Sequence, residues 1–153
     1  VLITKGVNTG NLDEITVAMS RGVGGAVEGQ IAETWRIKND GRTYLISPSR
    51  EVFYKSLSPK GGTESVPVTL EKRVLDEKKL MKLNSFSKDL VEKMKSKGID
   101  GPYDIELGFK DDKVWLFQVR PFVENKNAVN SEYLESITPK MDYNKKIDLT
   151  TKI

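Results

Sequence analysis

The chain has 153 residues, of which 37% are hydrophobic and 31% are charged, so it is long enough to bury a core and polar enough for a globular domain. It contains no cysteine and no histidine, which excludes disulfides, thiolate or imidazole metal sites and a Ser-His-Asp triad. The formal net charge of +3 arises from 25 Lys and Arg residues interspersed with 22 Asp and Glu residues, and we expect no nucleic-acid partner from this pattern. No apolar run approaches the ~20 residues that span a bilayer, so we expect no membrane association. The absence of cysteine is compatible with a reducing cytosol, so we expect a cytoplasmic location.

The first part of the chain predicts strands. The apolar start Val1-Leu2-Ile3 has strand character, which we interpret as a sign that the chain belongs to a longer protein. Residues 15–20 alternate apolar with small or polar side chains, and a glycine-rich segment over 22–29 ends this strand. A hairpin follows, with strands at 34–37 and 43–46 around a turn at 39–41. Residues 55–69 carry Ser, Pro and Lys with scattered apolar positions and are predicted to form a surface loop.

One long helix is predicted over residues 76–97. Asp76 is a suitable N-cap, and Gly98 stands where a left-handed terminator is expected. One face of this helix repeats apolar residues, namely Leu80, Leu83, Leu90 and Met94. Several strands and one main helix predict an α+β fold with an antiparallel sheet. Residues 125–153 are rich in Asn, Lys, Ser and Thr and are predicted to form a peripheral extension with a short helix at 131–137, which Pro139 ends.

Residues 104–121 predict a second hairpin, and its register decides which side chains share a face. A three-residue loop at 111–113 gives one wholly apolar face, whereas a two-residue loop shifts the register and sets Glu106 against Phe117. The pattern therefore favours the three-residue loop. The apolar face then carries Ile105, Leu107, Phe109, Trp115, Phe117 and Val119. We expect Trp115, Phe117 and Trp35 to lie in the core.

The other face of this hairpin is polar. In the favoured register Asp104 lies opposite Arg120, Glu106 opposite Gln118, and Gly108 opposite Leu116. The Cβ atoms of opposed residues are about 5 Å apart, close enough for a carboxylate and an amide oxygen to share one hard cation. The same residues also fit a plain solvent-facing strand pair with a cross-strand ion pair.

This hairpin resembles a family motif. A D-I-E strand, a short turn and a Q-x-R-P strand end the ATP-grasp domain of phosphoenolpyruvate synthase and pyruvate phosphate dikinase, also called the PEP/pyruvate-binding domain. Residues 18–29 resemble that family's segment G-L-G-E-x-V-V-x-G, although Gly25 stands where the family has glutamate and the segment is one residue shorter. Residues 47–50 and 60–62 fall where the family has a strand exit and a loop. The resemblance covers residues 1–124.

The resemblance implies that residues 1–124 form the C-terminal part, or lobe, of an ATP-grasp domain that binds ATP and Mg²⁺. Glu106 and Gln118 would hold the metal, Asp104 would support the nucleotide and metal, and Arg120 would be the catalytic residue that contacts the transferring phosphate. The family converts ATP, pyruvate and water to phosphoenolpyruvate, AMP and phosphate. The implied partners are a preceding ATP-grasp lobe of the same protein, and pyruvate or phosphoenolpyruvate. In this family the ATP-grasp site lies between two lobes and the preceding lobe contributes its own lysine and arginine, so we expect the isolated chain to fold but not to turn over ATP. The family's histidine carrier lies on a separate domain.

Two other functions remain open at this point. One is a non-catalytic module of the same fold that binds a nucleotide or a partner protein for regulation. The other is a basic adaptor that binds nucleic acid through its lysines. A P-loop and a dinucleotide fingerprint are both excluded, because Gln30 and Ile31 follow the last glycine of the run and Val27 stands three residues after Gly24.

Overall fold

The computed structural model describes residues 1–25, 32–69, 71–124 and 136–137. Its contacts divide the chain into two units, Val1–Phe122 and Val123–Ile153. The first unit contains β1 (Leu2–Ile3), β2 (Glu14–Met19), β3 (Glu33–Lys38), β4 (Thr43–Ser47), β5 (Phe53–Leu57), β6 (Thr63–Pro67), α1 (Glu77–Ser96), β7 (Tyr103–Lys110) and β8 (Lys113–Pro121). The predicted α+β class, with an antiparallel sheet and one main helix, is confirmed.

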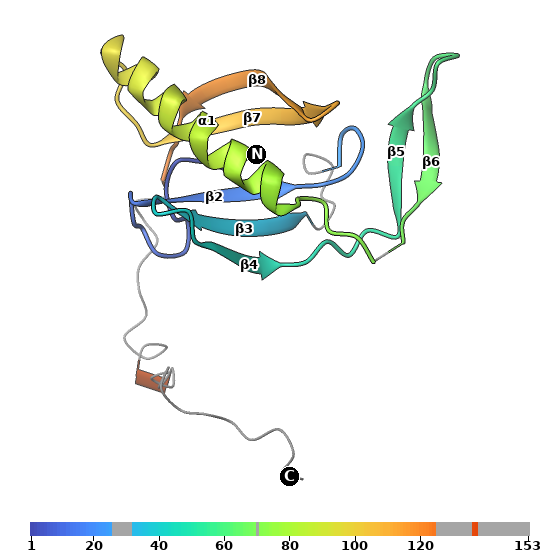
Figure 1. The fold of residues 1–153 in the computed structure, drawn as a ribbon, viewed down its shortest axis with the longest axis horizontal. Helices are drawn as coiled ribbons and strands as arrows, with labels where there is room; N and C mark the ends of the chain where they lie inside the picture. The colour runs from blue at the N-terminus through green and yellow to red at the C-terminus, as the bar shows by residue number, and fades with distance from the viewer. Residues whose placement is uncertain (26–31, 70, 125–135, 138–153) are drawn as a thin grey trace. The chain divides into compact units, whose positions relative to one another are not determined.

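The main sheet has six strands in the order β4-β3-β2-β1-β7-β8 (Figure 1). Each neighbouring pair runs antiparallel. The two-residue strand β1 joins the halves, because Leu2 pairs with Val17 of β2 on one side and with Ile105 of β7 on the other. The apolar start of the chain is therefore a central strand.

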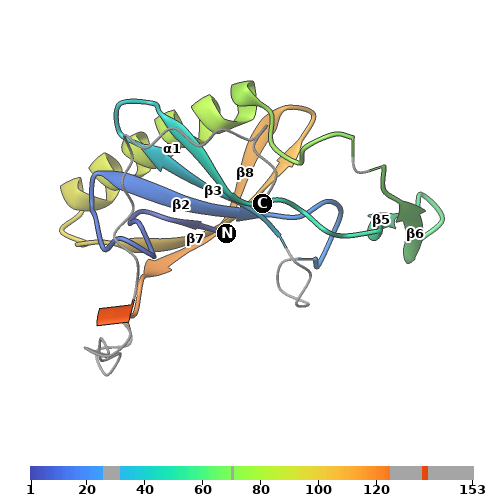
Figure 2. The same cartoon turned by 90° about the horizontal axis from the view of Figure 1, so that it is seen from below.

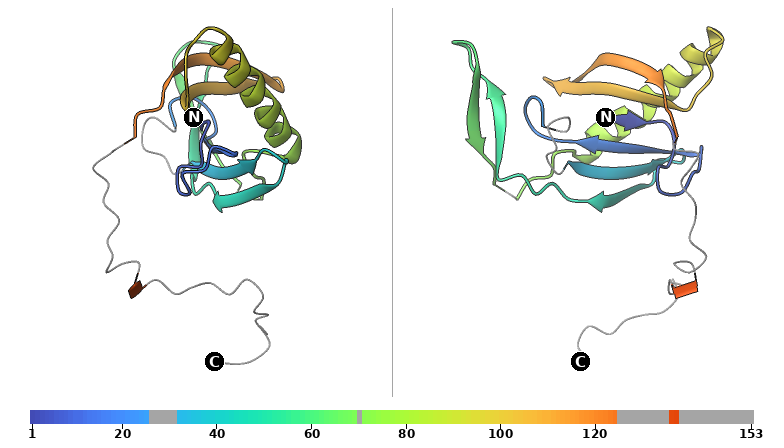
Figure 3. Two further views of the ribbon diagram at one scale, coloured as in Figure 1. Left: turned by 90° about the vertical axis from the view of Figure 1, so that its left-hand side faces the viewer. Right: turned by 180° about the vertical axis from the view of Figure 1, so that it is seen from behind.

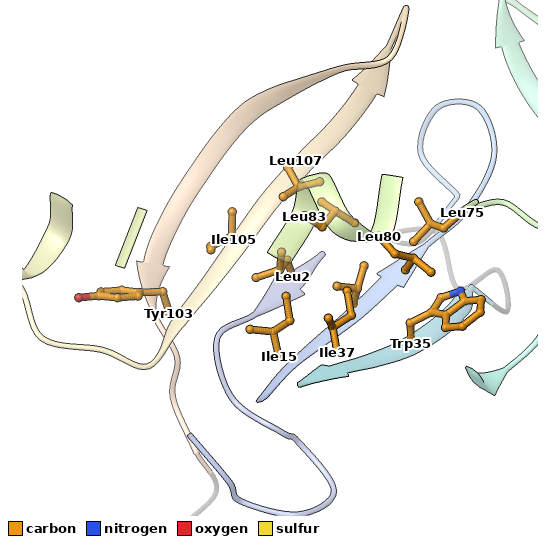
Figure 4. Packing of buried hydrophobic residues seen from close by; sticks show 11 residues of the cluster. Leu2, Ile15, Trp35, Ile37, Leu75, Leu80, Leu83, Tyr103, Ile105 and Leu107 are labelled. Atoms are coloured by element: carbon orange, nitrogen blue, oxygen red, sulfur yellow. The ribbon is translucent and has the colours of Figure 1, made fainter. Parts of the chain in front are cut away.

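Helix α1 lies across one face of this sheet, as the views along the sheet show (Figures 2 and 3). Strand residues alternate between buried and half-buried in β3 and over most of β7, as expected when one face packs on a helix. The buried cluster between sheet and helix consists of Leu2, Ile15, Val17, Trp35, Ile37, Leu75, Leu80, Leu83, Tyr103, Ile105 and Leu107 (Figure 4). The prediction that Trp35 lies in the core is confirmed.

Both ends of α1 follow the sequence signals. The side chain of Asp76 accepts a hydrogen bond from the backbone N–H of Lys79 at 2.8 Å. At the other end Gly98 has φ 72°, and the N–H of Ile99 reaches back to the carbonyl of Met94 at 3.1 Å. The helix therefore begins and ends where the cap residues dictate.

The surface loop predicted at 55–69 is wrong. These residues contribute to a separate two-stranded hairpin of β5 and β6, with pairs running from Phe53–Pro67 to Leu57–Thr63. Gly61 and Gly62, at φ 91° and 73°, form the turn at its tip. The strand signal was weak because most side chains of this hairpin are exposed and none is buried, so its apolar and polar residues follow no regular alternation.

The three-residue loop predicted at 111–113 is also wrong. Lys110 pairs with Lys113, and the two residues between them, Asp111 and Asp112, have φ 51° and 59°, as a two-residue type I′ turn requires. A β-bulge between the Glu106 and Leu107 pairs restores the predicted register farther along the strands. The hairpin therefore combines a two-residue turn with one extra residue in β8.

Three predicted features fall at least partly outside the described residues. They are residues 26–29 of the glycine-rich segment, residues 131–135 of the predicted helix at 131–137, and all but residues 136–137 of the predicted extension 125–153. Among the described residues, neither α1 nor any other helix combines the length and the hydropathy that a membrane-spanning helix needs.

The segment before α1 is anchored to the sheet by a buried carboxylate. Glu33 of β3 is only 2% exposed, and it accepts hydrogen bonds from Trp35 Nε1 at 2.7 Å and from the backbone N–H groups of Val74 and Leu75 at 3.0 Å each. Loss of this carboxylate would leave buried donors unsatisfied.

We therefore expect Glu33→Ala to lower the free energy of unfolding by at least about 2 kcal/mol, measured by urea denaturation. The matched control is Glu64→Ala on the exposed strand β6, for which we expect a change within about 0.5 kcal/mol. Equal effects of the two substitutions would contradict the anchoring role of Glu33.

A second prediction concerns the N-cap of α1. We expect Asp76→Ala to cost about 1 kcal/mol of stability, whereas Asp76→Asn keeps an acceptor for the N–H of Lys79 and costs less. The hydrogen bond from that backbone N–H, and then the ion pair with the Lys79 side chain, lower the pKa of Asp76 from 3.8. A lowered pKa in the folded state stabilises the protein above the unfolded pKa, and this contribution is lost as pH falls through the folded value. The stability difference between the unmodified protein and Asp76→Asn should shrink over that acid range in urea titrations, and a constant difference would contradict the account.

Candidate functional site

The face of the sheet opposite α1 carries the residues that the sequence singled out. Register pairs place one row of side chains across the full sheet on this face, which we call the open face. That row consists of Tyr44, Arg36, Thr16, Ile3, Asp104 and Arg120. The candidate site lies at the β7–β8 end of the open face, where strand β8 forms the edge of the sheet.

Asp104 and Arg120 form a close ion pair at this end. Arg120 donates from Nε to Asp104 Oδ2 at 2.9 Å, and its Nη2 lies 2.8 Å from the same oxygen. The Asp104 side chain is 16% exposed, whereas that of Arg120 is 55% exposed. A guanidinium carries five N–H groups, so Arg120 keeps donors that can meet a ligand from solvent.

Glu106 and Gln118 form the next row of the same face. They are direct partners in the register, as predicted, so their side chains lie on the same side of the hairpin. Glu106 is half-buried, with a side-chain exposure of 37%, and Gln118 is exposed. Nη2 of Arg120 lies 3.9 Å from Glu106 Oε1, so one guanidinium lies beside both carboxylates.

The donor set of this cluster suits a hard cation. Glu106 and Gln118 offer a carboxylate and an amide oxygen, the oxygen ligands that Mg²⁺ takes. Asp104 Oδ1 is buried, and no described residue donates to it, so this oxygen is an acceptor without a donor. Within the described ranges no three His, Cys, Asp or Glu side chains gather into a metal site. Glu106 and Gln118 could supply only two protein ligands, so an ion held here would have to complete its shell with other oxygens, such as those of phosphate and water.

The bulge changes which aromatic residues join this face. The predicted Gly108–Leu116 pair is wrong, because Leu107 pairs with Leu116 and Gly108 pairs with Trp115. The prediction that Trp115 and Phe117 lie in the core is wrong too, since they are 54% and 70% exposed. The apolar pattern alone did not predict the exposure of Trp115 and Phe117, because one inserted residue in β8 reverses the side-chain alternation beyond it.

The glycine-rich segment is held at its start by a contact that the sequence did not predict. The Arg21 guanidinium donates from Nη1 to Glu51 Oε1 at 2.9 Å and to the Ser49 hydroxyl at 3.4 Å, and from Nη2 to the carbonyl of Lys72. Gly22 follows at φ 69°, where an added Cβ would lie 2.0 Å from the carbonyl oxygen of Lys55. Because Arg21 and Glu51 are 30 residues apart, no local sequence pattern predicts their contact.

Two hollows of the described surface lie on the α1 side. One, of about 930 Å³, runs between the start of α1 and the β7–β8 turn, and Met81, Phe86 and Val114 supply much of its apolar lining. The other, of about 740 Å³, lies beside Trp35 and Arg73. Neither includes the Asp104, Glu106, Gln118 or Arg120 side chains, so the candidate site is part of an exposed sheet face and lies outside both hollows.

Comparison with known proteins adds no assignment. No protein-family model matches the chain, and a search of curated proteins gives no match either. The function therefore rests on the residues and the geometry of the open face.

A double-mutant cycle measures whether the Asp104–Arg120 pair serves stability. We expect Asp104→Ala, Arg120→Ala and the double variant to give a coupling energy of about 0.2–1 kcal/mol in urea denaturation, because the guanidinium is more than half exposed. The exposed pair of Asp40 and Arg42 is a matched control. A coupling energy above about 2 kcal/mol would show that the pair is a structural element and would weaken its assignment to a ligand site.

Proposed function

We propose that this chain binds Mg-ATP on the open face of the β7–β8 hairpin, as the C-terminal lobe of an ATP-grasp domain in a phosphotransferase of the phosphoenolpyruvate synthase type. The observation that carries the proposal is the register that sets Glu106 opposite Gln118 and Asp104 opposite Arg120 on one face. That is the arrangement which the D-I-E and Q-x-R-P motifs require if their polar residues are to act together.

Each residue has a distinct role in this proposal. Glu106 and Gln118 would hold the metal, which would supply positive charge next to the triphosphate. One carboxylate and one neutral amide leave a divalent ion with positive charge that attracts phosphate, whereas additional carboxylates would reduce that attraction. Asp104 fixes the guanidinium plane of Arg120 through Nε and Nη2. The remaining N–H groups of Arg120 neutralise charge on the transferring phosphoryl group, which is the main contribution a protein makes to this chemistry.

The candidate site lies on an exposed sheet face, which supports the proposal that another lobe covers it. Arg120 and Gln118 are exposed, and phosphoryl transfer requires that water be excluded from the reacting groups. We propose that a preceding lobe of the same protein covers the open face, and that the phosphoryl group passes toward pyruvate in the longer protein. The absence of cysteine is compatible with a cytoplasmic enzyme.

Isothermal titration of the chain with ATP, with and without Mg²⁺, tests the binding proposal. We expect Mg-ATP binding that Glu106→Ala and Gln118→Ala weaken at least about tenfold, since each removes a direct ligand of the ion. Omission of Mg²⁺ should weaken binding to a similar extent. Glu64→Ala, an exposed carboxylate on β6, is the matched control and should bind as the unmodified chain does. Binding that is indifferent to both substitutions and to the metal would refute this site.

Catalysis is tested on a protein that includes the preceding lobe proposed above together with this chain. We expect pyruvate-dependent formation of AMP from ATP, and a loss of at least about a hundredfold in kcat for Arg120→Ala, with Arg42→Ala as an exposed arginine control. The isolated chain should bind Mg-ATP without consuming it. Pyruvate-dependent ATP consumption by the isolated chain, or full activity of Arg120→Ala, would contradict the assignment.

A further inference from the structure

Two exposed aromatic side chains extend the candidate site along β8. Phe117 is 70% exposed and Trp115 is 54% exposed, whereas the other tryptophan of the chain, Trp35, is 4% exposed. A phenylalanine or tryptophan ring has a large apolar surface, and adjacent exposed rings usually mark a contact with a ligand or partner. The exposed rings of Phe117 and Trp115 therefore form a candidate surface for ligand contact.

The bulge places both rings on the open face. Phe117 is the extra residue of the bulge, and Trp115 is the direct partner of Gly108, which follows Glu106 by two residues on the same face. Gly108 has no side chain, and the Phe117 ring occupies the space above it, since an added Cβ at Gly108 would lie 3.2 Å from Cε2 and Cζ of the ring. An aromatic surface thus begins beside the Glu106–Gln118 row.

The order of groups along β8 matches the order of groups in a nucleoside triphosphate. From one end to the other the strand presents Arg120, Gln118, Phe117 and Trp115. A guanidinium suits the terminal phosphate, the Gln118 amide with Glu106 would hold the metal, and the aromatic rings lie on the far side of these two residues. Residues two apart on a strand are separated by about 7 Å, so these groups form one continuous strip.

We propose that Phe117 is the stacking platform for the base of the nucleotide, with Trp115 flanking it. The inference rests on the proposed Mg-ATP site and assigns its base-binding end. Stacking on an aromatic ring is available to every base because each has a π-face, so the ligand class is a nucleotide and not a bare polyphosphate. The Gly108 position contributes by leaving room for the ring to lie against the backbone.

The test compares two ligands, Mg-ATP and Mg-tripolyphosphate, by isothermal titration of the chain. Tripolyphosphate offers the same metal-bridging phosphates without a base. We expect Phe117→Ala and Phe117→Leu to weaken Mg-ATP binding about fivefold or more, with Mg-tripolyphosphate binding unchanged. The leucine variant keeps an apolar side chain and removes the π-face, so its effect separates stacking from simple apolar cover. Leu116→Ala, a 45% exposed residue of the same strand, is the matched control and should leave both affinities unchanged.

The outcomes are separable. If both ligands bind the unmodified chain and Phe117→Ala leaves the Mg-ATP affinity unchanged, the stacking platform is overturned and the phosphate site stands. If Phe117→Ala weakens both ligands equally, the ring acts on the phosphate end and the assignment to the base is overturned. If neither ligand binds the unmodified chain, the proposed Mg-ATP site fails and the stacking proposal fails with it. Thermal unfolding of each variant checks that these exposed positions leave the fold intact.

Discussion

A single inserted residue in β8 decides what the edge hairpin presents to solvent. Side chains alternate along a strand with a period of two, so the bulge at Phe117 lets the hairpin keep a two-residue turn at one end and the Glu106–Gln118 pair at the other. Without it, a two-residue turn would set Glu106 against Phe117 and divide the polar cluster between two faces. The candidate site, and the exposure of the rings beside it, both depend on this bulge.

The two faces of the sheet differ in what they carry: an apolar cluster on the α1 side and the candidate ligand-binding residues on the open face. The apolar cluster beneath α1, with the buried Glu33 anchor, holds the helix and the strands together. At its β7–β8 end the open face carries an exposed guanidinium, that of Arg120, and an acid with an unsatisfied buried oxygen, Asp104 Oδ1. This polar cluster is the part of the sheet that we assign to ligand binding, and the cluster beneath α1 is the part that we assign to stability.

Much of the fold follows from the sequence, and the failures have physical causes. Hydrophobic alternation identified β2, β3 and β7, each of which has buried residues, and the cap residues Asp76 and Gly98 identified α1. Strands β4 and β8 were identified as the hairpin partners of β3 and β7 across polar turns. The β5–β6 hairpin was missed because its exposed strands lack that alternation. The turn was misplaced because its two central residues are Asp111 and Asp112, whereas glycine is the usual signal for positive φ in a two-residue turn. The polar pairs were nevertheless predicted correctly, since the bulge restores the register at Gln118.

The most direct measurement of the central claim is the position of the metal ion bound with ATP. Mn²⁺ can replace Mg²⁺ at oxygen sites, and its unpaired electrons broaden the NMR signals of nearby nuclei. The account predicts that Mn-ATP broadens the backbone amides of Glu106 and Gln118 and the Gln118 side-chain amide first, with Glu106→Ala abolishing the effect. Broadening centred on the acidic residues of α1, or none on the β7–β8 hairpin, would contradict it.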